Sequence, residues 1–237
     1  MQSTELDPTL SQALGDAKKS SLKLVIGNKN YSSWSMRPWV AMTAFNIPFE
    51  EVKILLDQPG TSSSIAEYSS AGRVPVLIAG ETTTWDSLAI CEYLAEQFPE
   101  KNLWPQNVAR RAMARSICAE MHSGFGDLRR AMWMNIRASF PGKGRTTGAQ
   151  ADIGRISEIW EDCLSEAGAH QFLFGDFSIA DAYFAPVAMR FKTYDVSLAP
   201  ALHAYVERVI AHPAVAKWIA GALKETDRLP AYDTYPD

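Results

Sequence analysis

Two kinds of hydrophobic pattern divide the chain. Between residues 22 and 100, short apolar runs alternate with helical stretches, whereas beyond about residue 106 apolar residues recur only at helical intervals. This change predicts an α/β domain followed by an all-α helical domain. We place the domains at residues 21–100 and 106–237, after a polar, flexible extension of residues 1–20.

The first domain reads as a sheet of four strands. A buried strand at Leu22–Ile26, a helix at Trp34–Phe45 and a second strand at Phe49–Leu55 make a βαβ unit. Val74–Ile78 and Thr82–Trp85 flank a tight turn and predict a hairpin. A weak helix near residues 65–70 and a periodic helix from about residue 88 to 98 complete the order βαβ-α-ββ-α.

The second domain is predicted from apolar stripes at helical spacing. Pro200 and Pro213 stand where first-turn prolines of two final helices belong. Ser178 and Asp181 have the spacing of a reciprocal capping box, which marks the start of another helix. One stripe, expected to belong to the core, comprises Met113, Ile117, Met121, Phe125, Leu128 and Met132.

Composition excludes several classes of protein. The 237 residues carry 23 Lys plus Arg and 27 Asp plus Glu, a net charge of −4, so no cationic field favours nucleic acid as a partner. We also see no apolar run long enough to span a membrane and no secretory signal near the start. Cys91, Cys118 and Cys163 lie among apolar residues, outside any metal-ligand spacing, which favours buried thiols in a cytoplasmic protein without a metal.

A hydroxyl-rich segment joins the first strand to the first helix. It runs Tyr-Ser-Ser-Trp-Ser-Met-Arg-Pro over residues 31–38. Hydroxyl groups beside the unpaired N–H groups of a helix start can bind an anion, because the helix dipole is positive there. Ordinary N-capping by one serine explains the pattern equally well. The absence of a Gly-x-Ser-x-Gly elbow argues against a serine hydrolase.

Two further short motifs could bind a ligand. Arg73, Val74 and Pro75 stand where a loop meets a strand, and Asp86 and Ser87 open a helix. A carboxylate and a hydroxyl at a helix start can hold the ammonium and carboxylate of an amino acid. Capping alone accounts for Asp86 and Ser87 about as well.

Three motifs in this order resemble the cytosolic glutathione transferase family. They are Gly-Arg-Val-Pro-Val-Leu at residues 72–77, Asp-Ser-Leu-Ala-Ile at 86–90 and Gly-Asp-Phe-Ser-Ile-Ala-Asp at 175–181. The resemblance runs from about Leu22 to Leu223. It implies a thioredoxin-like N-terminal domain, an all-helical C-terminal domain and glutathione as co-substrate.

The resemblance also implies how glutathione is held. Val74 would precede a cis-Pro75 and offer its backbone to the cysteinyl part, while Asp86 and Ser87 would hold the γ-glutamyl end. Asp86 stands where many members have Glu or Gln, so its reach is shorter. Arg73 is a candidate for the glycyl carboxylate, with a solvated surface charge as the alternative.

The thiol-activating hydroxyl has three candidates. Ser32 to Ser35 resemble the Ser-Ser-Cys-Ser run of the zeta class, which selects Ser32. Counting back from Arg37 as in theta-like members selects Ser33, and Tyr31 is a third hydroxyl nearby. We rank them Ser32, Ser33, Tyr31. No cysteine occupies this segment, so the attacking sulfur is expected to come from glutathione.

The expected function is transfer of glutathione to a small electrophilic molecule. The zeta-like serines suggest a glutathione-dependent maleyl-type cis–trans isomerase as an alternative, although Trp34 replaces the cysteine of that class. A binding module without turnover is another alternative. The family further implies a two-fold homodimer. Loose candidates for the electrophile pocket are Met113, His122, Phe125 and Arg129.

Overall fold

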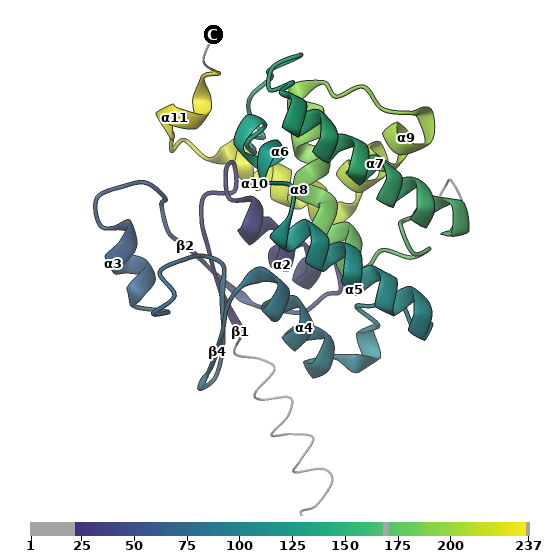
Figure 1. Cartoon of the computed structure of the whole chain (residues 1–237). Coiled ribbons are helices and arrows are strands. Elements are labelled where there is room, and N and C mark those ends of the chain that lie inside the picture. Colours follow the sequence, from purple (N-terminus) through teal and green to yellow (C-terminus); the bar gives the residue numbers. More distant parts are fainter. Residues whose placement is uncertain (1–21, 168–170, 236–237) are drawn as a thin grey trace, which may run out of the picture.

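A four-stranded mixed sheet forms the first half of the protein (Figure 1). The computed structural model describes residues 22–167 and 171–235, so the predicted extension lies outside the described residues. The strands β1 (Leu22–Ile26), β2 (Glu50–Lys53), β3 (Val76–Ala79) and β4 (Thr82–Thr84) lie in the order β2-β1-β3-β4. β1 pairs in parallel with β2 and antiparallel with β3, and β3 and β4 form the predicted hairpin.

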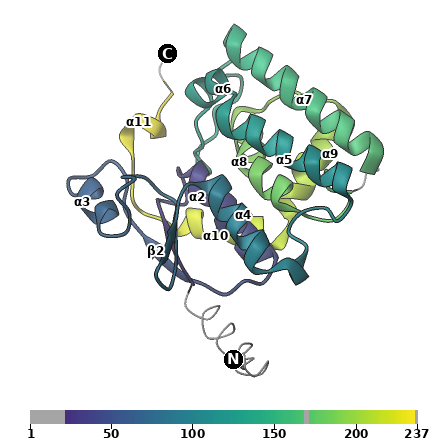
Figure 2. The same ribbon diagram turned by 60° about the horizontal axis from the view of Figure 1, so that its bottom comes forward.

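Helices cover both faces of this sheet. Successive side chains of β1 point to opposite faces, so its apolar residues have to be buried on each side. Leu24 and Ile26 join the main core, which includes residues of α2 (Ser33–Ala44) and α4 (Ser87–Gln97). Val25 points into a smaller cluster with Ile65 of α3 (Thr61–Ala66). Figure 2 shows α2 and α4 between the sheet and the helices α5 (Val108–Ser123) and α8 (Ile179–Tyr194), while α3 lies apart from them.

The second half is helical, apart from two isolated bridges near residues 172–176. Its central element is α8, which is buried along almost its whole length and packs against α2, α5 and α9. This architecture confirms the predicted fold class, a thioredoxin-like α/β domain with an all-α domain. The remaining helices are η1 (Pro99–Lys101), α5 (Val108–Ser123), α6 (Gly126–Ala131), α7 (Thr147–Ala167), α8 (Ile179–Tyr194), α9 (Pro200–Ala211), α10 (Pro213–Lys224) and α11 (Pro230–Asp233).

One member of the predicted core stripe is wrongly placed by the sequence pattern. Met113 is 46% exposed, whereas the other five members of that stripe are buried. An α-helix has 3.6 residues per turn, so each four-residue step drifts by about 40° around the axis. Two such steps separate Met113 from the buried Met121 and carry Met113 onto the outer side of α5.

The predicted capping box at the start of α8 is confirmed. Asp181 accepts hydrogen bonds from the backbone N–H of Ser178 at 2.9 Å and of Leu173 at 3.1 Å, and from the Tyr205 hydroxyl at 3.0 Å. Burial raises the pKa of the Asp181 carboxyl to about 6, against the opposing effect of these donors. The Asp181 carboxyl therefore connects the loop at Leu173 and the helix α9 to the start of α8 by hydrogen bonds.

Among the described helices, none combines the length and apolar character that a membrane crossing requires.

Replacing Asp181 with Ala should destabilise the protein by about 2–4 kcal/mol, because several buried donors lose their acceptor. Urea unfolding measures this free energy. The exposed Asp162→Ala on α7 is the matched control and should change it by about 0.5 kcal/mol or less. Equal unfolding midpoints for the two variants would contradict the role given to Asp181.

Candidate active site

A cleft of about 940 Å³ opens between the segment before α2 and the segment before β3. It brings together seven of the eight site residues predicted from the sequence. The seven are Tyr31, Ser32, Ser33, Arg73, Val74, Pro75 and Asp86. Residues of α3 and Tyr232 near the C-terminus complete its lining.

The hydroxyl segment is folded by its own backbone. The N–H groups of Tyr31 and Ser32 donate to the carbonyl of Asn28 at 3.1 and 2.8 Å, which turns the chain from β1 into α2. Ser32 is the N-cap residue, yet its side chain makes no capping hydrogen bond. Ordinary N-capping by a serine is therefore wrong as the explanation of this motif.

Ser32 directs its hydroxyl into the protein. Its Oγ donates to the Oγ of Ser35 at 2.7 Å, and Ser35 accepts in turn from the backbone N–H of Gly27 at 3.1 Å. Both serine side chains are buried. The proton of Ser32 is thus already used within the segment.

Ser33 has the opposite hydrogen-bond arrangement. Its Oγ accepts a hydrogen bond from Nη2 of Arg190 on α8 at 3.1 Å. This bond uses a lone pair of the hydroxyl and leaves its proton free to donate into the cleft that Ser33 lines. A donor whose oxygen is bound to a guanidinium is also a stronger donor.

Tyr31 is held by the C-terminal part of the chain. Its hydroxyl donates to the Asp233 carboxylate at 2.6 Å and accepts from Nη2 of Arg137 at 2.9 Å and from the N–H of Leu229 at 3.2 Å. All of its hydrogen-bonding capacity is therefore used. Tyr31 lines the cleft through its ring, with its proton directed to Asp233.

The segment before β3 presents backbone to the cleft. The Val74–Pro75 peptide bond is cis, as the resemblance implies, and Pro75 is buried while Val74 is half-buried. The Trp85–Asp86 bond is also cis. Arg73 is exposed at the rim, where its guanidinium is free to meet an anion in the cleft.

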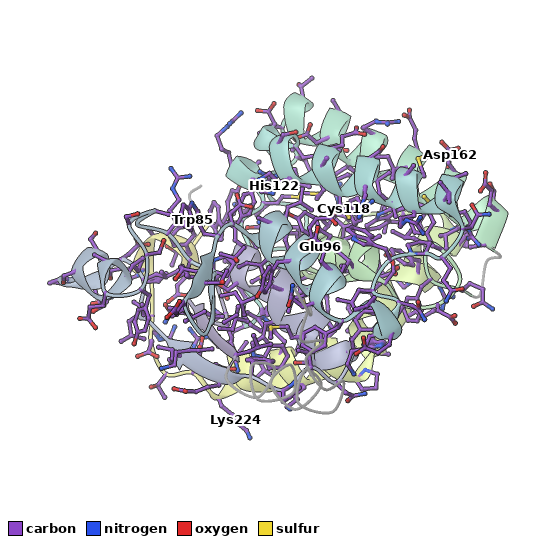
Figure 3. All side chains as sticks on the ribbon, turned by 90° about the horizontal axis from the view of Figure 1, so that it is seen from below. Trp85, Glu96, Cys118, His122, Asp162 and Lys224 are labelled. Atoms are coloured by element: carbon purple, nitrogen blue, oxygen red, sulfur yellow. The ribbon has the colours of Figure 1, made fainter. Side chains whose placement is uncertain are left out.

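Asp86 caps α4 and also reaches across to the helical half. Its Oδ1 accepts from the N–H of Leu88 at 3.1 Å, and its Oδ2 lies 3.1 Å from Nε2 of His122 on α5. Nδ1 of His122 lies 2.7 Å from the hydroxyl of Tyr183. Figure 3 shows His122 at the end of α5 nearer to Trp85, the neighbour of Asp86.

Ser87 does not line the cleft. Its side chain is fully buried, and its hydroxyl lies 3.0 Å from that of Tyr183. The side chain thus belongs to a chain of contacts that runs from Asp86 through His122 and Tyr183 to Ser87. Its implied contact with the γ-glutamyl end stays a prediction. Backbone N–H groups at the start of α4 are the alternative donors to that end of glutathione.

His122 is neutral in this chain of contacts. Burial and the charges of Arg37 and Arg129 lower its pKa below the ordinary value, against the opposing effect of Asp86. The neutral ring donates from Nε2 to Asp86 and accepts at Nδ1 from Tyr183. The contact with Asp86 is therefore a hydrogen bond at neutral pH rather than an ion pair.

The protein's own thiols are unavailable for chemistry. Cys91 and Cys118 are fully buried, and burial raises the pKa of the Cys91 thiol to about 12 and that of Cys118 well above its usual value. The Cys163 thiol is buried as well, with its pKa raised to about 12. All three are protonated at neutral pH, and none is among the residues that line the cleft.

The loose candidates for an electrophile pocket are only partly brought together. Arg129 lies over the ring of Trp34 at 5.0 Å, and the His122 ring meets the same ring edge-on at 5.2 Å. Phe125 is buried in the core, and Met113 faces outward. Trp34, His122 and Arg129 therefore form one wall beside the start of α2.

Two arginines of this site were given no role from the sequence. Arg37 and Arg190 are both buried, and Arg37 lies between the rings of Trp34 and Tyr183 at 4.3 and 4.2 Å. A detectable signal existed at Arg190, because an arginine inside the apolar run from Ala185 to Phe191 needs buried partners. Within the described ranges, no group of three or more His, Cys, Asp or Glu residues could hold a metal ion.

Comparison with known proteins agrees with this geometry. A family model described as the N-terminal domain of glutathione S-transferase matches residues 28–102, and one described as the C-terminal domain matches residues 143–221. The chain belongs to the glutathione S-transferase family. Glutathione is the co-substrate of this family, and the resemblance drawn from the sequence motifs is confirmed.

Relatives and solved structures place the chain within this family. It is 27% identical over 188 residues to a probable maleylacetoacetate isomerase 2 of Drosophila melanogaster, covering 78% of this chain and 82% of that protein. It is 28% identical over 172 residues to the maleylacetoacetate isomerase of Rattus norvegicus, covering 71% and 78%. A glutathione transferase homologue from Burkholderia, solved with bound glutathione, superimposes with a TM-score of 0.67 at 25% identity and covers 86% of this chain and all of that one.

The neutral state of His122 predicts a pH effect on stability. The unfolded chain binds a proton at His122 near pH 6.5, whereas the folded protein resists it, so the contribution of His122 to the free energy of unfolding should fall as the pH drops below about 6.5. The raised pKa of Asp181 acts in the opposite direction over the same range, and the lowered pKa of His212 acts in the same direction as His122. The test is therefore the difference between the two proteins: on acidification the free energy of unfolding of His122→Gln should fall less, or rise more, than that of the wild type. Urea unfolding at several pH values measures both proteins. An unchanged pH dependence in the variant would contradict a neutral His122.

Proposed function

We propose that this protein binds glutathione in the cleft, ionises its thiol at the start of α2 and directs the thiolate to a small electrophilic molecule. The observation that carries the proposal is the hydroxyl of Ser33, which lines the cleft with its proton free while Arg190 binds its oxygen. The Ser32 side chain does not cap α2, so the positive end of the helix dipole can act on an anion in the cleft.

Glutathione would lie along the segments that line the cleft. The backbone of Val74 before Pro75 would offer hydrogen bonds to the cysteinyl part of the peptide. Asp86 is exposed enough to meet the γ-glutamyl ammonium while His122 orients its carboxylate. Arg73 at the rim carries the charge needed for the glycyl carboxylate.

Ionisation of the thiol is the main contribution to catalysis. A free thiol with a pKa of about 8.5 is only about 3% thiolate at pH 7, and lowering that pKa by about two makes it roughly three-quarters thiolate. A hydroxyl that donates to the sulfur stabilises the charged form. The thiol proton leaves to solvent, and the serine keeps its own proton.

The geometry favours Ser33 over the two other hydroxyls. Ser32 donates to Ser35, and Tyr31 donates to Asp233, so either would have to break an existing hydrogen bond before it could serve the sulfur. Ser33 breaks none. This reverses the order of the two serines that the zeta-like motif suggested.

Ser33→Ala should lower kcat/KM for glutathione and a generic aryl halide by roughly tenfold at pH 7, because less of the bound thiol is ionised. The loss should shrink above about pH 9, where the thiol ionises without help. Ser32→Ala is the matched control and should change the rate by less than about threefold. A larger loss in Ser32→Ala than in Ser33→Ala would contradict the assignment.

Calorimetric titration with glutathione tests the proposed function itself. Binding at millimolar or lower glutathione is expected for the wild type. Absence of binding at that concentration would overturn the enzyme proposal. Binding with equal, negligible turnover in the wild type and both serine variants would support a module that binds without catalysis.

A second candidate is a glutathione-dependent cis–trans isomerase. It is favoured by the relatives named as maleylacetoacetate isomerases. Addition of the thiolate to a conjugated double bond, rotation and elimination would need the same ionised sulfur. Turnover of a maleyl-type diacid no faster than in buffer with glutathione would exclude this candidate.

The electrophile would bind where the helical half meets the start of α2. Trp34, His122 and Arg129 supply an aromatic and cationic wall beside the two serines. Such a wall suits a flat or anionic small molecule. The wall is built from three elements, which explains why the sequence did not predict its shape.

We also expect a two-fold homodimer that acts in the cytoplasm. The proposal rests on the family and on the exposed apolar residues Val108 and Met113 of α5, which a partner could cover. Light scattering at micromolar concentration should give a mass near twice the 26.2 kDa of one chain. The mass of a single chain would contradict the dimer.

A further inference from the structure

Arg190 is a buried arginine whose nitrogens each have a protein acceptor. Nε donates to the carbonyl of Met132 at 2.8 Å, Nη1 to that of Pro186 at 3.3 Å, and Nη2 to Oγ of Ser33 at 3.1 Å. Met132 directly follows α6, and Pro186 lies one turn earlier on α8. The guanidinium is therefore fixed by two carbonyls and presents its third nitrogen to the serine.

Two more arginines lie in the same region. Arg37 of α2 is buried between Trp34 and Tyr183, and its Nε and Nη1 have no hydrogen-bond partner. The guanidinium of Arg129 on α6 also lies over the ring of Trp34, and it donates to the carbonyls of Met121 and His122. The start of α2 is thus backed by three guanidinium groups from three helices.

The positive charge of these arginines is not cancelled locally. Among the described residues, none of the three forms an ion pair with a carboxylate. Most groups that act electrostatically on these arginines are protonated, and so uncharged, at neutral pH: they are Tyr183, Tyr194, Cys91 and Cys118. The carboxylate of Asp152 acts on Arg129, and it accepts a hydrogen bond from the N–H of Leu128. Asp86 is turned towards His122.

Mutual repulsion makes this arrangement costly without an anion. Burial and the charges of Arg37 and Arg129 lower the pKa of Arg190 to about 9, and burial and Arg37 lower that of Arg129 to about 10. Both groups remain charged at pH 7. A negative charge placed at the start of α2 would relieve this repulsion, whereas a neutral thiol would not.

We propose that Arg190 is a positioning residue for the ionisation of the glutathione thiol. It orients the Ser33 hydroxyl towards the sulfur. Together with Arg37 and Arg129 it supplies buried positive charge that favours the thiolate. The inference rests on the proposed function and deepens it. Arg190 does not touch the sulfur, because Ser33 lies between them. The sulfur loses its proton to solvent, Ser33 donates its O–H to the resulting thiolate, and no bond of Arg190 is broken.

A purely structural role makes a different prediction. Arg190 also joins α2, α6 and α8, so its loss is expected to lower stability in either case. Only the positioning role changes the pKa of the bound thiol. The pKa is therefore the decisive readout.

The test is an ultraviolet titration of glutathione thiolate in complex with the full-length protein. Arg190→Gln should raise the pKa of the bound thiol by about 1, and Arg190→Lys, which keeps the charge, should raise it less. In a Ser33→Ala background the effect of Arg190→Gln should shrink, because the hydroxyl it orients is gone. Arg155→Gln is the matched control, since it removes an exposed arginine paired with Glu120 and should leave the thiol pKa unchanged.

Each outcome decides between the claims. A wild-type complex whose thiol titrates as in free glutathione would overturn the proposed function and this inference with it. A lowered pKa in the wild type that is the same in folded Arg190→Gln would overturn the inference alone. If Arg190→Gln fails to fold, Arg190→Lys and Ser33→Ala decide. A thiol pKa equal to that of the wild-type complex in both variants contradicts the proposal.

Discussion

The site depends on one buried contact between the two halves of the protein, the hydrogen bond from Arg190 of α8 to Ser33 of α2. A buried guanidinium without a carboxylate is unfavourable unless its hydrogen bonds are satisfied. Here two carbonyls satisfy it, and the third bond fixes the serine that lines the cleft. The helical half therefore supports a residue of a cleft that is lined mainly by residues of the sheet half.

The same principle governs the other side of the cleft. Asp86 belongs to α4, but its orientation comes from His122 of α5, and His122 is held in turn by Tyr183 of α8. Ser33 and Asp86, two of the residues proposed to meet glutathione, are thus each held by a residue of the helical half. Because α8 is buried along its length and anchored at its start by Asp181, it can hold both supports at fixed positions.

The sequence predicted the fold and most of the cleft because their signals are local. Short apolar strand runs, first-turn prolines and the capping box each depend on neighbours within a few residues, and the structure contains all three. The stripe that placed Met113 in the core failed because repeated four-residue steps drift around the helix. Roles that depend on distant partners were not predictable: nothing near Ser33 in the sequence indicates that its hydroxyl accepts from Arg190 of α8.

We expect glutathione, and no thiol of the protein, to provide the attacking thiolate beside Ser33. A crystal structure of the complex with glutathione decides this. The sulfur should lie within about 3.5 Å of Ser33 Oγ, with the bond between Ser33 and Arg190 kept. A sulfur that contacts Ser32 or Tyr31 in place of Ser33, or a Ser33 that has turned away from Arg190, would contradict it.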